Sequence, residues 1–146
     1  MSNDIKIRVC SSGDLDKIMK IENECFEHPY PEYVFKDYLG SELFLVAENQ
    51  SEIVGYIITD VRKKEGVVIS IAVEPDFQRK GIGKELISKT IDKLSTEYIV
   101  LTVRMNNEGA QKFYIELNFE RLYVINEYYE NNDDAIVMGK KLQKDE

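Results

Sequence analysis

The sequence predicts a single mixed α/β domain, in which a central mixed sheet of seven strands carries about four helices on its two faces. Its 146 residues suit one domain, and no repeat or Gly/Ser/Pro-rich linker interrupts them, so we assign residues 1–146 to that domain. Strand-like segments outnumber helical ones. One amphipathic segment lies between two almost continuous apolar runs, which predicts one parallel strand pair.

The first elements follow from the spacing of apolar residues. Residues 5–9 alternate apolar and basic side chains, which predicts a half-buried strand. Ser11 or Ser12 can cap the helix that follows, and two prolines within residues 28–31 end it. A second, short helix is then expected over residues 32–39.

The rest of the chain predicts six further strands and two further helices. An amphipathic helix, with an apolar stripe from Ile82 to Leu94, lies between two strands and completes a βαβ unit. Asn107 can cap the other helix. Polar turns at residues 49–52 and 63–66 separate neighbouring strands. The strands are expected at residues 43–48, 53–62, 67–73, 98–103, 119–126 and 135–142.

Composition and charge exclude several classes of protein. The net charge of −8 and the pI near 4.8 oppose a general affinity for nucleic acid, which rests on basic side chains. The same charge suits a cationic partner such as an amine, although it can also serve only to keep the protein in solution. No apolar run is long enough for a membrane span, and the N-terminus has no apolar signal core. Two cysteines are too few for a disulfide framework or a thiolate zinc site, so we expect a reduced, cytoplasmic protein without a metal.

The segment that joins the first strand of the parallel pair to the following helix contains Gly81 and Gly83. Because these residues have no Cβ, a ligand can approach the backbone at the start of the helix. Free N–H groups and the helix dipole favour an anion there, and Arg79, Lys80 and Lys84 add positive charge. A pyrophosphate would satisfy all of these groups. The alternative is a glycine-containing turn with solvated basic side chains.

The glycines belong to a longer pattern, in which Gln78 is followed by Gly81 and Gly83 after a Val-x-Pro segment. Neither a nucleoside-triphosphate P-loop nor a dinucleotide fingerprint is present. The pattern instead resembles the acetyl-CoA-binding motif of the GNAT superfamily of N-acetyltransferases, and residues 104–119 look like the second motif of that superfamily. The order and spacing of the predicted elements agree, so the resemblance covers essentially the whole chain.

The resemblance implies that acetyl-CoA is the cofactor and that it lies between splayed parallel strands. Its pantetheine arm would run along Ile71, Ala72 and Val73 and pair with their backbone. Asn107 would face this arm, which does not exclude its role as a helix cap. Tyr114 would approach the thioester sulfur; the alternative for Tyr114 is a core aromatic residue. The pyrophosphate would lie on the turn formed by Gln78, Arg79, Lys80, Gly81, Ile82, Gly83 and Lys84.

Two tyrosine-rich segments narrow the resemblance to the N-terminal protein acetyltransferases, which include bacterial ribosomal-protein-alanine enzymes and archaeal and eukaryotic catalytic subunits. Residues 29–33, Pro-Tyr-Pro-Glu-Tyr, lie between the first two helices. Residues 128–138 resemble the hairpin that closes over the peptide N-terminus in these enzymes, a role that suits the amphipathic tyrosine side chain. The alternative is an ordinary tyrosine-rich hairpin. The resemblance implies substrate-binding roles for Phe26, Tyr30, Tyr33, Tyr128 and Tyr129.

The chemistry requires a neutral amine that attacks the thioester directly, without a covalent enzyme intermediate. An α-amine is about a tenth neutral at pH 7, whereas a lysine is neutral at about 4 parts in 10,000, so an N-terminal substrate depends less on a strong base. Tyr114 would protonate or hydrogen-bond the departing thiolate. Some relatives place a Glu or His base where this chain has Thr102, and others use a Glu in the loop before the second helix. Alignment on Tyr30 and Pro31 puts His28, with Glu27 beside it, at that loop position, so the resemblance implies His28 as the candidate base. An exposed loop histidine is the alternative, and Glu32 and ordered water are rivals.

We therefore expect an N-acetyltransferase that acts on the α-amine of a protein or peptide N-terminus, with lysine side chains as a secondary substrate. A ribosomal or auxiliary subunit is a compatible partner, and the enzyme is expected as a monomer or weak dimer. Two alternatives stay open: a small polyamine as the substrate, and a non-catalytic acyl-CoA-binding sensor or structural module. Cys10 and Cys25 have no activating neighbour in the sequence and are interpreted as structural.

Overall fold

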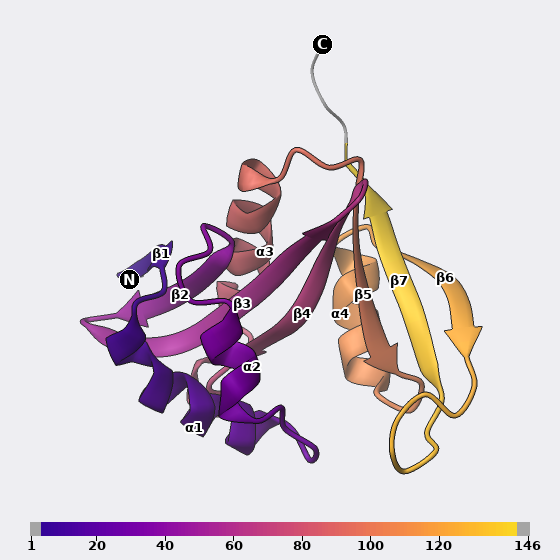
Figure 1. Ribbon diagram of the computed structural model, residues 1–146, viewed down its shortest axis with the longest axis horizontal. Helices are drawn as coiled ribbons and strands as arrows, with labels where there is room; N and C mark the ends of the chain where they lie inside the picture. The colour runs from indigo at the N-terminus through magenta and orange to yellow at the C-terminus, as the bar shows by residue number, and fades with distance from the viewer. Residues whose placement is uncertain (1–3, 143–146) are drawn as a thin grey trace. The chain divides into compact units, whose positions relative to one another are not determined.

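The computed structural model describes residues 4–142, whose seven strands are hydrogen-bonded in the order β1-β2-β3-β4-β5-β7-β6 (Figure 1). Four α-helices and two short 3₁₀ turns, Ser12–Asp14 and Pro75–Phe77, connect the strands within these residues. The elements are β1 (Ile5–Val9), α1 (Leu15–Cys25), α2 (Glu32–Asp37), β2 (Phe44–Asn49), β3 (Glu52–Arg62), β4 (Glu65–Val73), α3 (Ile82–Lys93), β5 (Tyr98–Arg104), α4 (Glu108–Glu116), β6 (Glu120–Ile125) and β7 (Ala135–Lys141).

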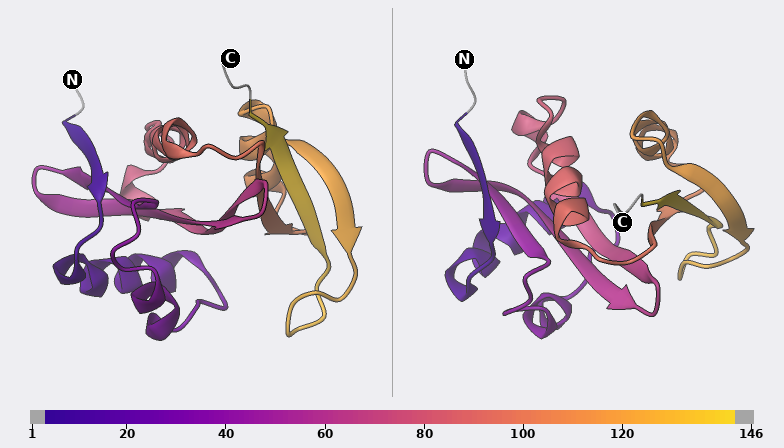
Figure 2. Two further views of the ribbon diagram at one scale, coloured as in Figure 1. Left: turned by 45° about the horizontal axis from the view of Figure 1, so that its top comes forward. Right: turned by 90° about the horizontal axis from the view of Figure 1, so that it is seen from above.

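The described chain forms two compact units, and the first contains residues 4–59 and 69–93. In this unit β2 pairs antiparallel with both β1 and β3. The helices α1 and α2 cover one face of these strands and α3 covers the other (Figure 2). Apolar residues recur at helical spacing on α1, and successive side chains of β2 and β3 point to opposite faces of the sheet. Large apolar side chains of the helix and the strands therefore fill the layer between them. The fully buried side chains of this core include Ile18, Ile21, Phe35, Phe44 and Tyr56.

The second unit contains residues 60–68 and 94–142. The start of β4 pairs in parallel with β5, where Glu65–Val67 lie opposite Tyr98–Val100. The strand β7 pairs antiparallel with β5 on one side and with β6 on the other. Gly139 of β7 permits close packing at this point, because a Cβ there would lie 2.9 Å from the Cδ1 atom of Leu122.

The predicted fold class is confirmed, since the mixed sheet, the helices and the single parallel pair all occur within residues 4–142. Three local features differ from the prediction. A 3₁₀ turn capped by Ser11 precedes α1. The first hairpin is tighter than expected, because Gln50 and Ser51 both adopt positive φ angles (51° and 73°), which suit a two-residue connection. Strand β4 already begins at Glu65 instead of following a turn through Gly66, because both residues pair with β5.

The assignment of residues 1–146 to one domain stays a prediction, because residues 1–3 and 143–146 lie outside the described residues and the rest forms two units. Within the described range of 4–142, no helix is long and apolar enough to cross a membrane.

Candidate active site

A turn that is rich in glycine and basic residues connects β4 to α3 in the first unit. Gly81 has a φ angle of +86°, and a Cβ at this position would meet no atom within 4 Å, so backbone conformation rather than crowding favours glycine. Ile82 is buried and Gly83 half-buried in the first turn of α3. This open approach, the positive end of the helix and the nearby positive charges fit a pyrophosphate. The basic side chains at the turn, all exposed, are Arg79, Lys80 and Lys84.

The end of β4 leads directly into this turn. Ala72 is buried, whereas Ile71 and Val73 are half-buried on the opposite face of the strand. The carbonyl oxygen of Val73 accepts a hydrogen bond from Gln78 Nε2 at 2.9 Å and one from Cys25 Sγ at 3.4 Å. Gln78 therefore closes the turn with its own side chain, and the predicted cofactor residues from 71 to 84 form one continuous segment of the first unit.

Two predicted residues of the second unit lie at the start and on the buried face of α4. The Asn107 Oδ1 atom accepts a hydrogen bond from the Ala110 N–H at 3.0 Å, which confirms its predicted role as a helix cap. Tyr114 is 7% exposed, and its ring packs at centroid distances of 5.1 Å from Phe113 and 5.5 Å from Phe119. Burial raises the pKa of Tyr114, so its phenol stays protonated at neutral pH and can donate a hydrogen bond.

The loop between α1 and α2 and the first turn of α2 carry the other predicted residues of the first unit. The His28 Nε2 atom lies 3.9 Å from a Glu27 carboxylate oxygen, and 45% and 86% of these two side chains are exposed. At this exposure such a contact is weak and does not fix the imidazole in one orientation. The predicted site residues of this segment, all exposed, are Phe26, Glu27, His28, Tyr30 and Tyr33.

A buried carboxylate that was not among the predicted site residues contacts this loop. Glu22 of α1 is 2% exposed, and its Oε2 atom accepts a hydrogen bond from the backbone N–H of Tyr30 at 2.9 Å. Its Oε1 atom accepts from Ser70 Oγ at 3.0 Å and from the Tyr56 hydroxyl. Burial and the nearby Glu22 carboxylate raise the pKa of Tyr56, which therefore remains a donor. The signal in the sequence was the place of Glu22 on the apolar stripe of α1, one turn after Ile18.

The connection between β6 and β7 in the second unit carries Tyr128 and Tyr129. Arg104, the last residue of β5, donates through Nη1 to Asp133 Oδ2 at 3.0 Å and to Asn131 Oδ1 at 3.1 Å. Its guanidinium carbon lies 3.8 Å from the centroid of the Tyr129 ring. The Tyr128 ring is half exposed and meets the Tyr129 ring edge-on, at a centroid distance of 4.9 Å. Arg104 therefore acts together with the backbone hydrogen bonds of the connection, such as those from Tyr128 and Tyr129 to the Asp133 carbonyl oxygen, to order the two tyrosines.

Thr102 occupies β5 two residues before Arg104 and is exposed. A hydroxyl group is not a base near neutral pH, so this position supplies no carboxylate or imidazole to the second unit.

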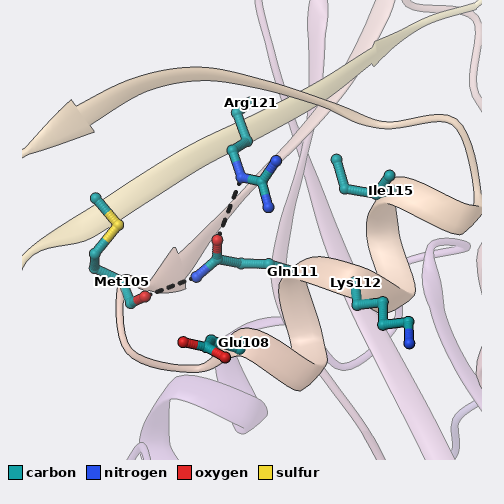
Figure 3. A pocket seen from close by; sticks show the side chains of 6 residues that line it. All are labelled: Met105, Glu108, Gln111, Lys112, Ile115 and Arg121. Carbon is teal, nitrogen blue, oxygen red and sulfur yellow. Dashed lines mark hydrogen bonds between the residues drawn. The ribbon is translucent and has the colours of Figure 1, made fainter.

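A pocket beside α4 is lined by none of the predicted site residues (Figure 3). Gln111 bridges its wall, donating to the Met105 carbonyl oxygen at 2.8 Å and accepting from Arg121 Nε at 3.3 Å. The pocket is lined by Met105, Glu108, Gln111, Lys112, Ile115 and Arg121.

The cysteines and the acidic residues show no second reactive centre in the described chain. Cys10 and Cys25 are free thiols; burial raises the pKa of Cys10 to about 12 and also raises that of Cys25. Neither residue is therefore a thiolate at neutral pH. Among residues 4–142, no group of three His, Cys, Asp or Glu side chains could hold a metal ion.

Comparison with protein families gives a match to the Acetyltransferase (GNAT) family over residues 15–119. The chain is 37% identical over 142 residues to an uncharacterized N-acetyltransferase of Methanocaldococcus jannaschii, covering 92% of this chain and 90% of that protein. It is 31% identical over 157 residues to an N-alpha-acetyltransferase of Saccharolobus solfataricus (95% and 94% covered). It is 33% identical over 140 residues to the ribosomal protein bS18-alanine N-acetyltransferase of Salmonella typhimurium (91% and 95% covered).

Solved structures with the same fold include Ard1 from Thermoplasma volcanium, with a TM-score of 0.92 at 22% identity over 97% of this chain and 100% of that chain. At this identity the likeness concerns the fold alone. Naa50 of Arabidopsis thaliana in complex with the bisubstrate analogue CoA-Ac-MVNAL matches with a TM-score of 0.83 at 25% identity, over 94% of this chain and 99% of that chain.

Proposed function

The chain belongs to the acetyltransferase (GNAT) family, and from that membership we propose that this enzyme acetylates the α-amine of a protein or peptide N-terminus. It is an N-acetyltransferase, and acetyl-CoA is its cofactor. The observation that carries the proposal is the pair of ordered tyrosine-bearing connections, one held by Glu22 and the other by Arg104. The relatives named for N-alpha and for bS18-alanine acetylation support the same substrate class.

The proposed cofactor-binding residues are 71–73 and 78–84 of the first unit, and Asn107 and Tyr114 of the second. The backbone of residues 71–73 would pair with the pantetheine arm, and the turn around Gly81 would bind the pyrophosphate. The open space at Gly81 and its exposed basic neighbours support this assignment. Bound acetyl-CoA supplies the activated acyl group as a thioester.

The proposed substrate residues are aromatic side chains with exposed surface in the two connections. An N-terminal peptide offers an extended backbone, a small side chain and an amine, and a tyrosine can contact the first two while its hydroxyl binds a polar group. The residues are Phe26, Tyr30, Tyr33, Tyr128 and Tyr129, of which Tyr33 is the most exposed at 69%.

In the proposed reaction the amine attacks in its neutral form and Tyr114 donates a hydrogen bond to the departing thiolate. Burial raises the pKa of the Tyr114 phenol, so the group stays protonated at neutral pH, which supports a hydrogen bond from its hydroxyl to the thiolate as the bond to the acetyl group breaks. His28, with Glu27 beside it, is the proposed base for the proton that leaves the amine. Its place on an exposed loop would let it exchange that proton with water.

The enzyme's secondary substrates, partners, location and oligomeric state are also proposed. Lysine side chains would be secondary substrates because their amines are rarely neutral at pH 7. A ribosomal or auxiliary subunit would present the substrate, and the enzyme would work in the cytoplasm as a monomer or weak dimer. The non-catalytic alternative is set aside, because the chain belongs to an acetyltransferase family and its relatives carry the names of acetyltransferases.

The test is an incubation of the enzyme and acetyl-CoA with a peptide library of varied N-terminal residues, and separately with spermidine, read by mass spectrometry. We expect a mass gain of one acetyl group on the α-amine of a subset of peptides. The net charge of −8 also permits a polyamine substrate. A strong preference for spermidine over every peptide would refute the proposal.

A further inference from the structure

The Glu22 carboxylate is a charged group in the core of the first unit. It is 2% exposed, and its partners are two hydroxyl groups and one backbone N–H. No ion pair is recorded for Glu22 among residues 4–142, so no cation offsets its burial there. An apolar side chain of similar size would avoid this desolvation and fill the same space. Packing alone therefore does not explain a carboxylate at position 22.

The donor that distinguishes this cluster from an ordinary buried network is the Tyr30 N–H. Tyr30 stands between Pro29 and Pro31, and proline has no N–H, so Tyr30 contributes the single backbone donor of residues 29–31. That donor is bonded to Glu22 Oε2 at 2.9 Å. The prolines restrict the loop backbone, and the carboxylate holds the backbone donor that lies between them.

The other oxygen of the carboxylate contacts the strand that leads to the cofactor turn. Ser70 of β4 donates to Glu22 Oε1 at 3.0 Å, and Ser70 immediately precedes the proposed pantetheine segment of residues 71–73. One carboxylate thus links the loop that carries Tyr30 to the strand that carries the proposed acyl donor. All of these residues belong to the first unit.

We propose that Glu22 is a positioning residue, which sets the Tyr30 loop relative to the end of β4 and thereby determines the affinity for the amine substrate. This inference rests on the proposed function, because it assumes that the loop binds a peptide N-terminus. Glu22 contacts neither reacting group; it acts through the Tyr30 backbone and Ser70.

The experiment compares Glu22→Leu with Glu22→Gln and with Tyr56→Phe. Leucine removes both acceptors, whereas glutamine keeps an oxygen for Tyr30 N–H and turns its amide toward hydroxyl groups that can accept. Tyr56→Phe removes one donor of the same cluster but leaves the bond between Glu22 and Tyr30. We expect Glu22→Leu to raise the KM for a peptide substrate about tenfold or more, while Glu22→Gln and Tyr56→Phe stay within about threefold. The KM for acetyl-CoA should change less than about threefold in all three.

A second readout does not depend on turnover. In the ¹⁵N-labelled protein, the Tyr30 amide should exchange its hydrogen about tenfold faster or more in Glu22→Leu, and at nearly the wild-type rate in Glu22→Gln and Tyr56→Phe. If Glu22→Leu fails to fold, the triple variant with Tyr56→Phe and Ser70→Ala removes the hydroxyl groups left unpaired. Its control is the double variant Tyr56→Phe with Ser70→Ala.

The outcomes separate this inference from the proposed function. Unchanged peptide KM in Glu22→Leu, or an equal rise in Tyr56→Phe at equal loss of thermal stability, would overturn the positioning role while peptide acetylation stands. An enzyme that acetylates no peptide would remove the proposed function; faster Tyr30 exchange in Glu22→Leu alone would still support the link between the loop and β4.

Discussion

The α1–α2 loop and the β6–β7 connection both carry tyrosines that we assign to the substrate, but the two are held by opposite means. Glu22 is buried, negative and bonded to a backbone N–H of its loop. Arg104 is positive, and its side chain remains 24% exposed while it contacts Asn131, Asp133 and the Tyr129 ring. A buried charge couples a loop to the stability of its unit, whereas a partly exposed one orders side chains at little cost to folding.

The largest effect should arise at a residue of neither connection. Tyr114 assists the departing thiolate in the proposed reaction, so Tyr114→Phe should lower kcat by about 10- to 1,000-fold because the thiolate then leaves without a hydrogen-bond donor. Steady-state kinetics should show nearly unchanged KM values, since the ring and its packing remain. Full activity in Tyr114→Phe, together with inactivity of His28→Ala or Glu27→Ala, would show that the base in the α1–α2 loop, and not Tyr114, limits the chemical step.

A substitution in the turn between β4 and α3 should weaken cofactor binding without affecting either tyrosine-bearing connection. Gly81 has a φ angle of +86°, which costs a β-branched residue about 1–2 kcal/mol. In Gly81→Val the free turn should relax out of this conformation and regain it only on binding, which should weaken acetyl-CoA binding about 5- to 30-fold. Asparagine tolerates this conformation better, and Gly81→Asn is the matched control. Titration calorimetry with CoA measures both. Equal affinity in Gly81→Val and wild type would remove the turn from the cofactor site.

Substitutions of Arg104 test the role of the partly exposed anchor. Arg104→Met should raise the peptide KM about 3- to 10-fold, because the Tyr129 ring loses its cation and Asp133 its partner, with little change in the thermal midpoint. Arg104→Lys keeps the charge but loses the planar stack, so an intermediate KM is expected. A fall in stability as large as that of Glu22→Leu would contradict the distinction between the two anchors.

A rise of the pH into the alkaline range should produce the smallest effect, which is a change in stability. It compares one buried tyrosine in each unit. Burial raises the pKa of Tyr56 in the first unit and of Tyr114 in the second. Below about pH 10 both the folded and the unfolded chain keep these protons; above it the unfolded chain loses them first, so stability falls as the pH rises. Denaturant unfolding between pH 8 and 11 should show a shallower fall in Tyr56→Phe and in Tyr114→Phe. The control Tyr123→Phe removes an exposed hydroxyl, and an equal flattening there would contradict burial as the cause.

Local patterns predicted the elements and the glycine-containing turn between β4 and α3, because their signals lie within a few residues of one another. Asn107 could be assigned as a cap from its place before a helical stripe, and its bond to Ala110 spans three residues. The anchors could not be predicted in this way. Glu22 meets Ser70 across 48 positions of the chain, and Arg104 meets Asp133 across 29, so only the folded strands bring them together.

Local sequence patterns also did not identify a single base. Thr102 revealed that the usual strand position lacks a base, but the exposed loop around His28 offers several groups and fixes none of them. Neither the sequence nor the contacts of His28 select one group over its neighbours.

The most direct test of the central claim is a competition at pH 7 between two peptides of one sequence that contains a lysine. One peptide has a free α-amine, and the other has a blocked α-amine and offers only the lysine. From the neutral fractions of the two amines, we expect acetylation of the α-amine to exceed that of the lysine by about 100-fold or more, measured by mass spectrometry. Equal acetylation of the two peptides, or acetylation at lysine alone, would contradict the assignment of an N-terminal substrate.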